Sequence, residues 1–210
     1  MAHSLKPMGN LVLMDVVGAH LENKTLFVEP YLHQLLPSLL STLFHSSLPP
    51  THATLLRTSA AQTLSRLLTQ HSTTYSSLSP RIMKTLLLAL ISGGKSKGTR
   101  EGAVKGLVAV GKEAVRKGLV ESGGTRVVAT DCHNSNSRES NSLVVAVLDA
   151  LRVLHPSSET TMTGSLDRSN ALDSEVYNTL TDLLGEFFAN KVANDASWAR
   201  EIAKSAAVLS

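Results

Sequence analysis

This 210-residue sequence contains almost no cysteine, and it has no long apolar run. The single cysteine, Cys132, excludes an internal disulfide and favours a reducing compartment. No apolar run reaches the ~18 residues that a membrane-spanning helix requires. The opening segment, MAHSLKPMGN, has no apolar stretch after its charge, which argues against a signal peptide. We expect residues 1–8 to be a leader or an expression scar.

Aromatic residues and net charge are also scarce. Aromatic side chains make up 4% of the chain and the net charge is +3. The sequence therefore predicts neither extensive aromatic stacking surfaces nor a strong net electrostatic field. The 42% of hydrophobic residues are mostly Leu, Ala and Val, which favours helices packed on helices. A chain of this length can bury one substantial core. The composition therefore predicts an all-α protein.

Apolar periodicity predicts a succession of helices and two polar loops. The helices are expected at about 10–22, 29–44, 53–70, 81–91, 99–111, 112–118, 143–154, 174–192 and 197–209. Segments rich in Ser, Asn and Thr predict long polar loops at about 123–142 and 155–172. We expect residues 9–210 to form a single domain.

The predicted helices repeat along the chain. A shift of 43 residues superimposes the following residues: Pro37 on Pro80, Leu43 on Leu86, Arg57 on Arg100, Ala60 on Ala103, and Leu64 on Leu107. A period of about 40–47 residues with two helices per unit is typical of HEAT-type repeats, whose units stack because none buries its apolar face alone. The sequence thus predicts an α-solenoid of HEAT-type helical hairpins with degenerate C-terminal units.

Two prolines occupy matching places in this repeat. Proline inside a helix removes a backbone donor and costs roughly 3 kcal/mol, so its presence within a leucine-rich segment needs a reason. A bend that lets the first helix of a hairpin curve round its neighbour would explain Pro37. Pro80 is expected to begin its helix, because proline is tolerated in a first turn.

Three ordered blocks resemble a known family. They are TLFVEPYLHQLLPSLLSTL, RTSAAQTLSRLLTQHSTTYSSLSPRIMKTL and GTREGAVKGLVAVGKEAVRKGLV, all between residues 10 and 120. Together they are similar to the C-terminal HEAT-repeat domain of the sixth TBP-associated factor. That factor is a subunit of the general transcription factor TFIID, shared in many fungi with the SAGA coactivator.

This resemblance implies a non-enzymatic scaffold in the nucleus that connects subunits within TFIID, and in some species SAGA, for transcription initiation by RNA polymerase II. The implied partners are other subunits of these complexes, with self-association through a second copy. The resemblance implies no catalytic, cofactor-binding or metal-binding residues. It also implies no membrane association and no small-molecule substrate. An alternative is a HEAT-type adaptor outside transcription, such as a transport or phosphatase scaffold.

Candidate chemical sites are weak in the sequence. Gly94, Lys95 and Ser96 match the end of a phosphate-binding loop, but the motif's earlier glycine is replaced by Ala89 and the preceding segment is helical. The eight histidines lack the clustered spacing of a zinc site. No nucleophile elbow is present, and Cys132 is expected in a polar loop.

Arg57 and Arg100 recur with the repeat. We expect each to bind backbone carbonyls or an acidic residue of the adjacent unit, in preference to a partner protein.

A basic run over residues 95–117 holds seven cations and two acids, a net charge of +5. The remainder of the chain is therefore at −2, so the whole basic excess lies here. A solvated face is the ordinary explanation of such a run, but it is also the best candidate for a surface that contacts acidic subunits, with DNA phosphates as the less favoured ligand. The candidate residues are Lys95, Lys97, Lys105, Lys112, Arg116 and Lys117.

Overall fold

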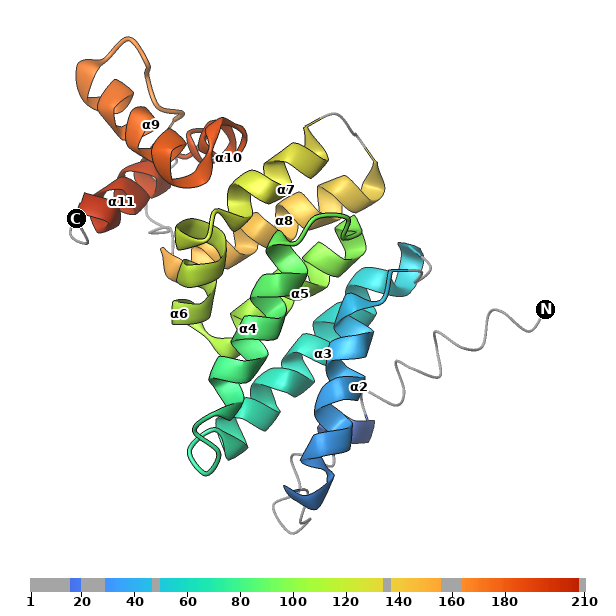
Figure 1. Ribbon diagram of the computed structural model, residues 1–210. Helices are drawn as coiled ribbons and strands as arrows, with labels where there is room; N and C mark the ends of the chain where they lie inside the picture. Colours follow the sequence, from blue (N-terminus) through green and yellow to red (C-terminus); the bar gives the residue numbers. More distant parts are fainter. Residues whose placement is uncertain (1–15, 20–28, 47–49, 134–136, 156–163, 208–210) are drawn as a thin grey trace.

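The structure is a computed structural model that describes residues 16–19, 29–46, 50–133, 137–155 and 164–207. The described residues form helices and no strand, which confirms the predicted all-α class (Figure 1). The elements are η1 (Glu29–Tyr31), α2 (Leu32–Phe44), α3 (Pro50–His71), α4 (Leu78–Ile91), α5 (Lys97–Val110), α6 (Lys112–Val115), the π-helical turn η2 (Arg116–Glu121), α7 (Gly124–Cys132), α8 (Arg138–Leu154), α9 (Ala171–Leu184), α10 (Glu186–Val192) and α11 (Ala196–Ala207).

Three helical hairpins stack in chain order within this described part. Helices α2 and α3 form the first, α4 and α5 the second, and α7 and α8 the third, so the colours of Figure 1 pass from blue to yellow across the stack. Helix α5 lies at the centre and packs against α2, α3, α4 and α8. The predicted HEAT-type α-solenoid is therefore confirmed.

The second helices of the hairpins lie on the inner side of the stack. Helix α5 packs against both α3 and α8, and α3 also contacts α8 directly, although they belong to units two places apart. The hydroxyl oxygens of Thr54 on α3 and Ser142 on α8 are hydrogen-bonded 3.0 Å apart. A row of elements approaches its second neighbours only on the inside of a curve, so α3, α5 and α8 form the concave face.

Residues related by the 43-residue shift occupy equivalent core positions. Leu64 on α3 and Leu107 on α5 are both 0% exposed, as are Leu43 and Leu86 on the first helices. Each leucine packs within one continuous core cluster that runs through the hairpins. The repeat read from the sequence therefore describes real packing positions.

A glycine allows the first two hairpins to approach closely. A Cβ atom placed on Gly102 of α5 would lie 1.8 Å from the carbonyl oxygen of Leu43, at the end of α2. No side chain fits there, because the obstructing atom belongs to backbone that cannot swing aside. Gly102 therefore sets the distance between α2 and α5.

The two prolines differ as expected in their place within the helix. Pro37 lies inside α2 with its ring exposed, whereas Pro80 is in the first turn of α4. The latter placement confirms that Pro80 belongs to a helix start. That Pro37 bends α2 stays a prediction.

The predicted polar loop at about 123–142 is wrong for most of its length. Residues Gly124–Cys132 form α7, and α8 already begins at Arg138. Helix α7 buries only a narrow stripe that includes Thr125, Val128 and Cys132. The apolar periodicity of this segment is therefore weak, although the segment is helical. The Ser137 hydroxyl accepts a hydrogen bond from the Ser140 backbone N–H at 3.2 Å, and this cap explains why a serine-rich segment begins a helix.

Two further expectations need adjustment at the C-terminal end. The predicted single helix at 174–192 is divided at Gly185, whose φ of 80° ends α9 and precedes α10. Helix α9 begins at Ala171, so the predicted loop at 155–172 also ends slightly earlier; its residues 156–163 lie outside the described part. The closing pair of helices thus becomes the three-helix group α9, α10 and α11.

Specific polar contacts join this C-terminal group to the solenoid and within itself. The indole N–H of Trp198 on α11 donates to the carbonyl oxygen of His155 at the end of α8, at 2.7 Å. Arg200 of α11 donates to the Asp173 carboxylate of α9 at 2.7 Å. The first contact ties the C-terminal group to the third hairpin, and the second holds α9 and α11 together within the group.

The segments nearest the N-terminus are only partly described. The expected leader at residues 1–8 lies outside the described residues, and of the predicted helix at 10–22 only residues 16–19 are described; these four are helical. None of the helices in the described ranges has both the length and the apolarity needed to cross a bilayer.

Candidate interaction surface

Arg57 joins two successive hairpins inside the core. The residue is buried, with 4% of its surface exposed, and Nη2 donates to the carbonyl oxygen of His45, which follows α2 of the same unit, at 2.9 Å. Its Nη1 donates to Glu101 Oε2 on α5 of the next unit, also at 2.9 Å. The guanidinium thus satisfies an open helix end and forms a buried ion pair between units.

Arg100 repeats this arrangement one unit further along. Its guanidinium donates to the carbonyl oxygens of Leu90 and Ser92 at the end of α4, the second of these at 3.1 Å. Its Nε lies 2.5 Å from Asp131 Oδ2 on α7 of the following unit. Both arginines therefore bind backbone carbonyls of their own unit and an acid of the next, which confirms the structural role expected from their period.

Sequence reasoning did not identify the acidic partners of these arginines. Glu101 follows Arg100 directly, so helix α5 accepts an ion pair from the previous unit and supplies one to the next. A search for acids near one repeat length from Arg57 would have found Glu101, 44 residues later. Asp131 has no such signal, because it lies 31 residues after Arg100 on a first helix.

The candidate basic residues are distributed along the whole of α5 and the turn after it. Lys95 is exposed in the loop before α5, and Lys97 in its first turn donates to the Ser140 hydroxyl of α8 at 2.6 Å. Lys112 begins α6 beyond the other end. Since α5 has 14 residues, about 20 Å of helix separates the two ends. The basic run therefore forms two groups in the structure, one at each end of α5, with Lys105 between them.

The group after α5 is partly neutralised by two acids. Arg116 donates from Nη2 to Glu113 Oε1 at 2.7 Å and also pairs with Glu121, while Lys117 Nζ lies 3.3 Å from Glu113 Oε1. Hydrogen bonds from Arg116, and then from Lys117, lower the pKa of the Glu113 carboxyl. Lys112 remains exposed beside this cluster. The end group keeps an excess of one positive charge.

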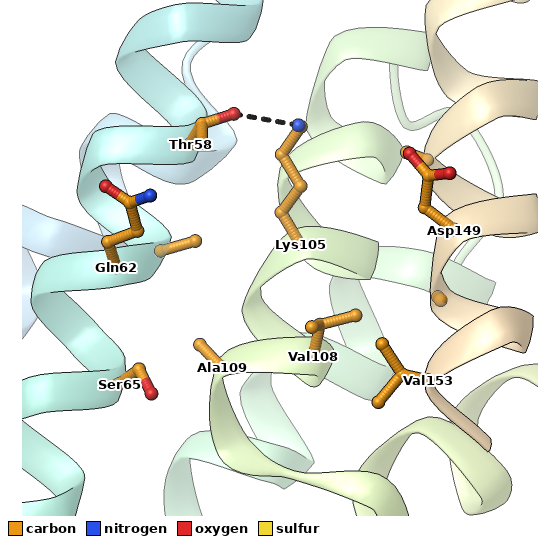
Figure 2. A pocket seen from close by; sticks show the side chains of 11 residues that line it. Thr58, Gln62, Ser65, Lys105, Val108, Ala109, Asp149 and Val153 are labelled. Carbon is orange, nitrogen blue, oxygen red and sulfur yellow. Dashed lines mark hydrogen bonds between the residues drawn. The ribbon is translucent and has the colours of Figure 1, made fainter. Parts of the chain in front are cut away.

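Lys105 lies in a groove on the concave face (Figure 2). The groove has a volume of about 330 Å³, with α5 as its floor and α3 and α8 as its walls. Lys105 Nζ donates to the Thr58 hydroxyl on α3 at 2.9 Å and lies 4.0 Å from Glu101 Oε1. Asp149 of α8 stands on the opposite side, as Figure 2 shows.

The other sites considered from sequence do not assemble in the described structure. Gly94 to Ser96 lie in a loop between α4 and α5, and no strand precedes them. The described residues contain no group of three His, Cys, Asp or Glu side chains able to hold a metal ion. Cys132 is buried at the end of α7 and not in a loop, and burial raises the pKa of its thiol, which disfavours the nucleophilic thiolate.

Comparison with known proteins identifies one family model. The model of the TAF6 C-terminal HEAT repeat domain matches residues 2–123. The SAGA complex/transcription factor TFIID complex subunit Taf6 of Schizosaccharomyces pombe is 41% identical over 117 residues, covering 52% of this chain and 26% of that protein. The transcription initiation factor TFIID subunit 6 of Arabidopsis thaliana is 36% identical over 107 residues, covering 50% of this chain and 20% of that protein. Subunit 6b of the same plant is 32% identical over 109 residues, covering 50% and 21%.

The chain thus spans about a quarter or less of the length of these relatives. No solved structure matches it significantly. The matched residues include the first two hairpins and both repeated arginines, while α7 and all later helices lie beyond residue 123.

Proposed function

The chain belongs to the TAF6 C-terminal HEAT repeat domain family, and from this premise we propose that it is a non-enzymatic scaffold that connects subunits of a nuclear transcription complex of the TFIID or SAGA type. The observation that carries the proposal is the family match over residues 2–123, supported by relatives that are named as subunits of those complexes. The fold suits the role, because stacked hairpins present long surfaces that neighbouring proteins can follow.

The ion pairs between units give this scaffold a further property. The buried pair Arg57–Glu101 and the half-buried pair Arg100–Asp131 each join two successive units, so each unit holds the next in a defined orientation. A protein that spaces other subunits needs such rigidity more than it needs a reactive site. The geometry therefore supports positioning of partners as the activity of the domain.

The proposal is tested by affinity enrichment from nuclear extract of the source cells, followed by mass spectrometry. The tagged chain should enrich TFIID or SAGA subunits over an unrelated α-solenoid that carries the same tag. Enrichment of transport factors or phosphatase subunits, without transcription subunits, would contradict the proposal and favour a HEAT-type adaptor outside transcription.

We also propose that the cations of the basic run contact acidic surfaces of those partners. Replacing Lys112, Arg116 and Lys117 together with Glu reverses three charges at the end of α5. Because unlike charges attract over about one Debye length, binding should weaken in the variant and the deficit should shrink as salt rises. Titration of purified partner subunits against both proteins at two salt concentrations measures the effect, with duplex DNA as a parallel titrant.

A matched control changes the same amount of charge elsewhere. Arg81, Lys84 and Arg138 are exposed on α4 and α8, and their replacement by Glu should leave partner binding nearly unchanged. If both triple variants bind like the unmodified chain at low salt, the basic run is an ordinary solvated face. Loss of DNA binding alone would assign the run to nucleic acid.

A further inference from the structure

The groove on the concave face combines an apolar lining with one incompletely satisfied cation. Small and aliphatic side chains line most of it, while Thr58, Gln62 and Ser65 form the α3 wall and Asp149 stands on the α8 wall (Figure 2). One turn before Thr58 and Ala146, the hydroxyls of Thr54 and Ser142 form a hydrogen bond that joins the two walls.

Exposed apolar residues extend this surface beyond the groove itself. Leu55 is 53% exposed on α3 and Val145 is 54% exposed on α8. Leu55 precedes Thr58 by three residues and Val145 precedes Asp149 by four, and side chains at these spacings share one face of a helix. The helix that forms each wall thus also carries an exposed aliphatic side chain outside the groove lining.

Lys105 supplies the electrostatic character of the groove. An ammonium group has three donors, and among the described residues Lys105 Nζ has one hydrogen-bond acceptor, Thr58 Oγ1. The closest carboxylate oxygen, Glu101 Oε1, lies 4.0 Å away, beyond hydrogen-bond distance, and the other oxygen of this carboxylate, Oε2, pairs with Arg57. Burial lowers the pKa of Lys105, against the opposing effect of Glu101 and Asp149.

A protein segment that covered this groove would remove the remaining water from Lys105. Such desolvation is unfavourable unless the incoming segment supplies an acceptor, and a carboxylate supplies the strongest one. Asp149 would repel that carboxylate on the α8 side. The favourable position is therefore beside Gln62 and Thr58, where the Gln62 amide can also donate.

From this charge complementarity we propose that the groove is the docking site for a partner-protein segment that presents aliphatic side chains next to one Asp or Glu. The aliphatic side chains occupy the hollow over Val108, Ala109 and Val153, and the carboxylate binds Lys105. The inference rests on the proposed scaffold function, because it names the chemistry by which one partner attaches to it.

The test uses synthetic helical peptides and the purified chain. Each fluorescent peptide carries Leu at two positions four residues apart and a third residue, Glu, Gln or Lys, three residues further on the same face. Anisotropy titration should show the Glu peptide binding about tenfold more tightly than the Gln peptide, the usual effect of one charge-assisted hydrogen bond. The Lys peptide should bind least.

Variants of the chain then locate the site. Lys105→Gln should abolish the preference for Glu over Gln, and Lys105→Arg should retain it. Ala109→Leu should weaken all three peptides by filling the floor of the groove. Lys84→Gln, an exposed change on α4, serves as the matched control and should bind like the unmodified chain. Circular dichroism and thermal melting verify that every variant is folded.

The position of the bound peptide is read from methyl resonances of isotopically labelled Val108 and Val153, which should shift on saturation. Absence of saturable binding, equal binding of Glu and Gln peptides, or an unchanged preference in Lys105→Gln would overturn the proposal. So would methyl shifts confined to other faces. Because only the purified chain and peptides are used, such a failure leaves the scaffold function to be decided separately by enrichment from nuclear extract.

Discussion

Replacing Glu101 with Ala should lower the free energy of unfolding by roughly 3–5 kcal/mol, the cost typical of removing one partner from a buried ion pair. Glu101 is 2% exposed and its carboxylate accepts a hydrogen bond from Arg57, which is itself 4% exposed. Without Glu101 the Arg57 cation remains buried between the first two hairpins with only the His45 carbonyl as a described partner of its Nη atoms. Urea denaturation followed by circular dichroism measures the loss.

The matched control is Glu113→Ala. Glu113 also pairs with an arginine and a lysine, but it is exposed on α6, where water screens the interaction. Its removal should scarcely change the denaturation midpoint. A second comparison replaces both Arg57 and Glu101 with Met, which should recover much of the lost stability because no charge is left buried.

Similar midpoints for Glu101→Ala and Glu113→Ala would show that the Arg57–Glu101 pair does not join the hairpins as the structure indicates. In that case the repeated arginine would be free for the partner contact that sequence reasoning considered less favourable.

Replacing Leu107 with Ala should destabilise the chain by roughly 2–5 kcal/mol, and Leu64→Ala should do the same. Both leucines are 0% exposed at equivalent places in successive second helices, so truncation leaves a cavity between units. Chemical denaturation under identical conditions gives the two differences in unfolding free energy.

Ser76→Ala provides the contrast within the same hairpin region, because Ser76 is exposed in the turn before α4. It should change the unfolding free energy very little. Equal effects of the Leu64, Leu107 and Ser76 substitutions would contradict the assignment of the two leucines to inter-unit core positions.

The first two hairpins were predictable because the same pattern of apolar and basic residues occurs in both. Leu64 and Leu107, or Arg57 and Arg100, mark the same register twice, so a single shift of the sequence identified both buried faces and the role of the arginines. Helix α7 was missed for the opposite reason. It is short, it buries a narrow stripe, and its neighbour α8 begins at a serine cap within a segment whose composition is typical of loops.

Gly185 illustrates a local ambiguity that the sequence does not resolve. A glycine inside an apolar helical pattern is tolerated at modest cost, so the pattern alone predicted one continuous helix. The packing of α10 against α7 and α9 favours a break, and glycine alone adopts the required positive φ without strain.

The sequence by itself determined the helical class, the repeat, the family and the leucines that fill the core, because burial imposes a periodic pattern on apolar residues. Only the tertiary structure decided which polar residues meet. Thr58, Lys105 and Asp149 come from three different helices and share one groove because the solenoid curves and brings α3 toward α8 across α5. A residue on an open concave face is under no requirement to be apolar or periodic, so no pattern in the chain could have placed these three together.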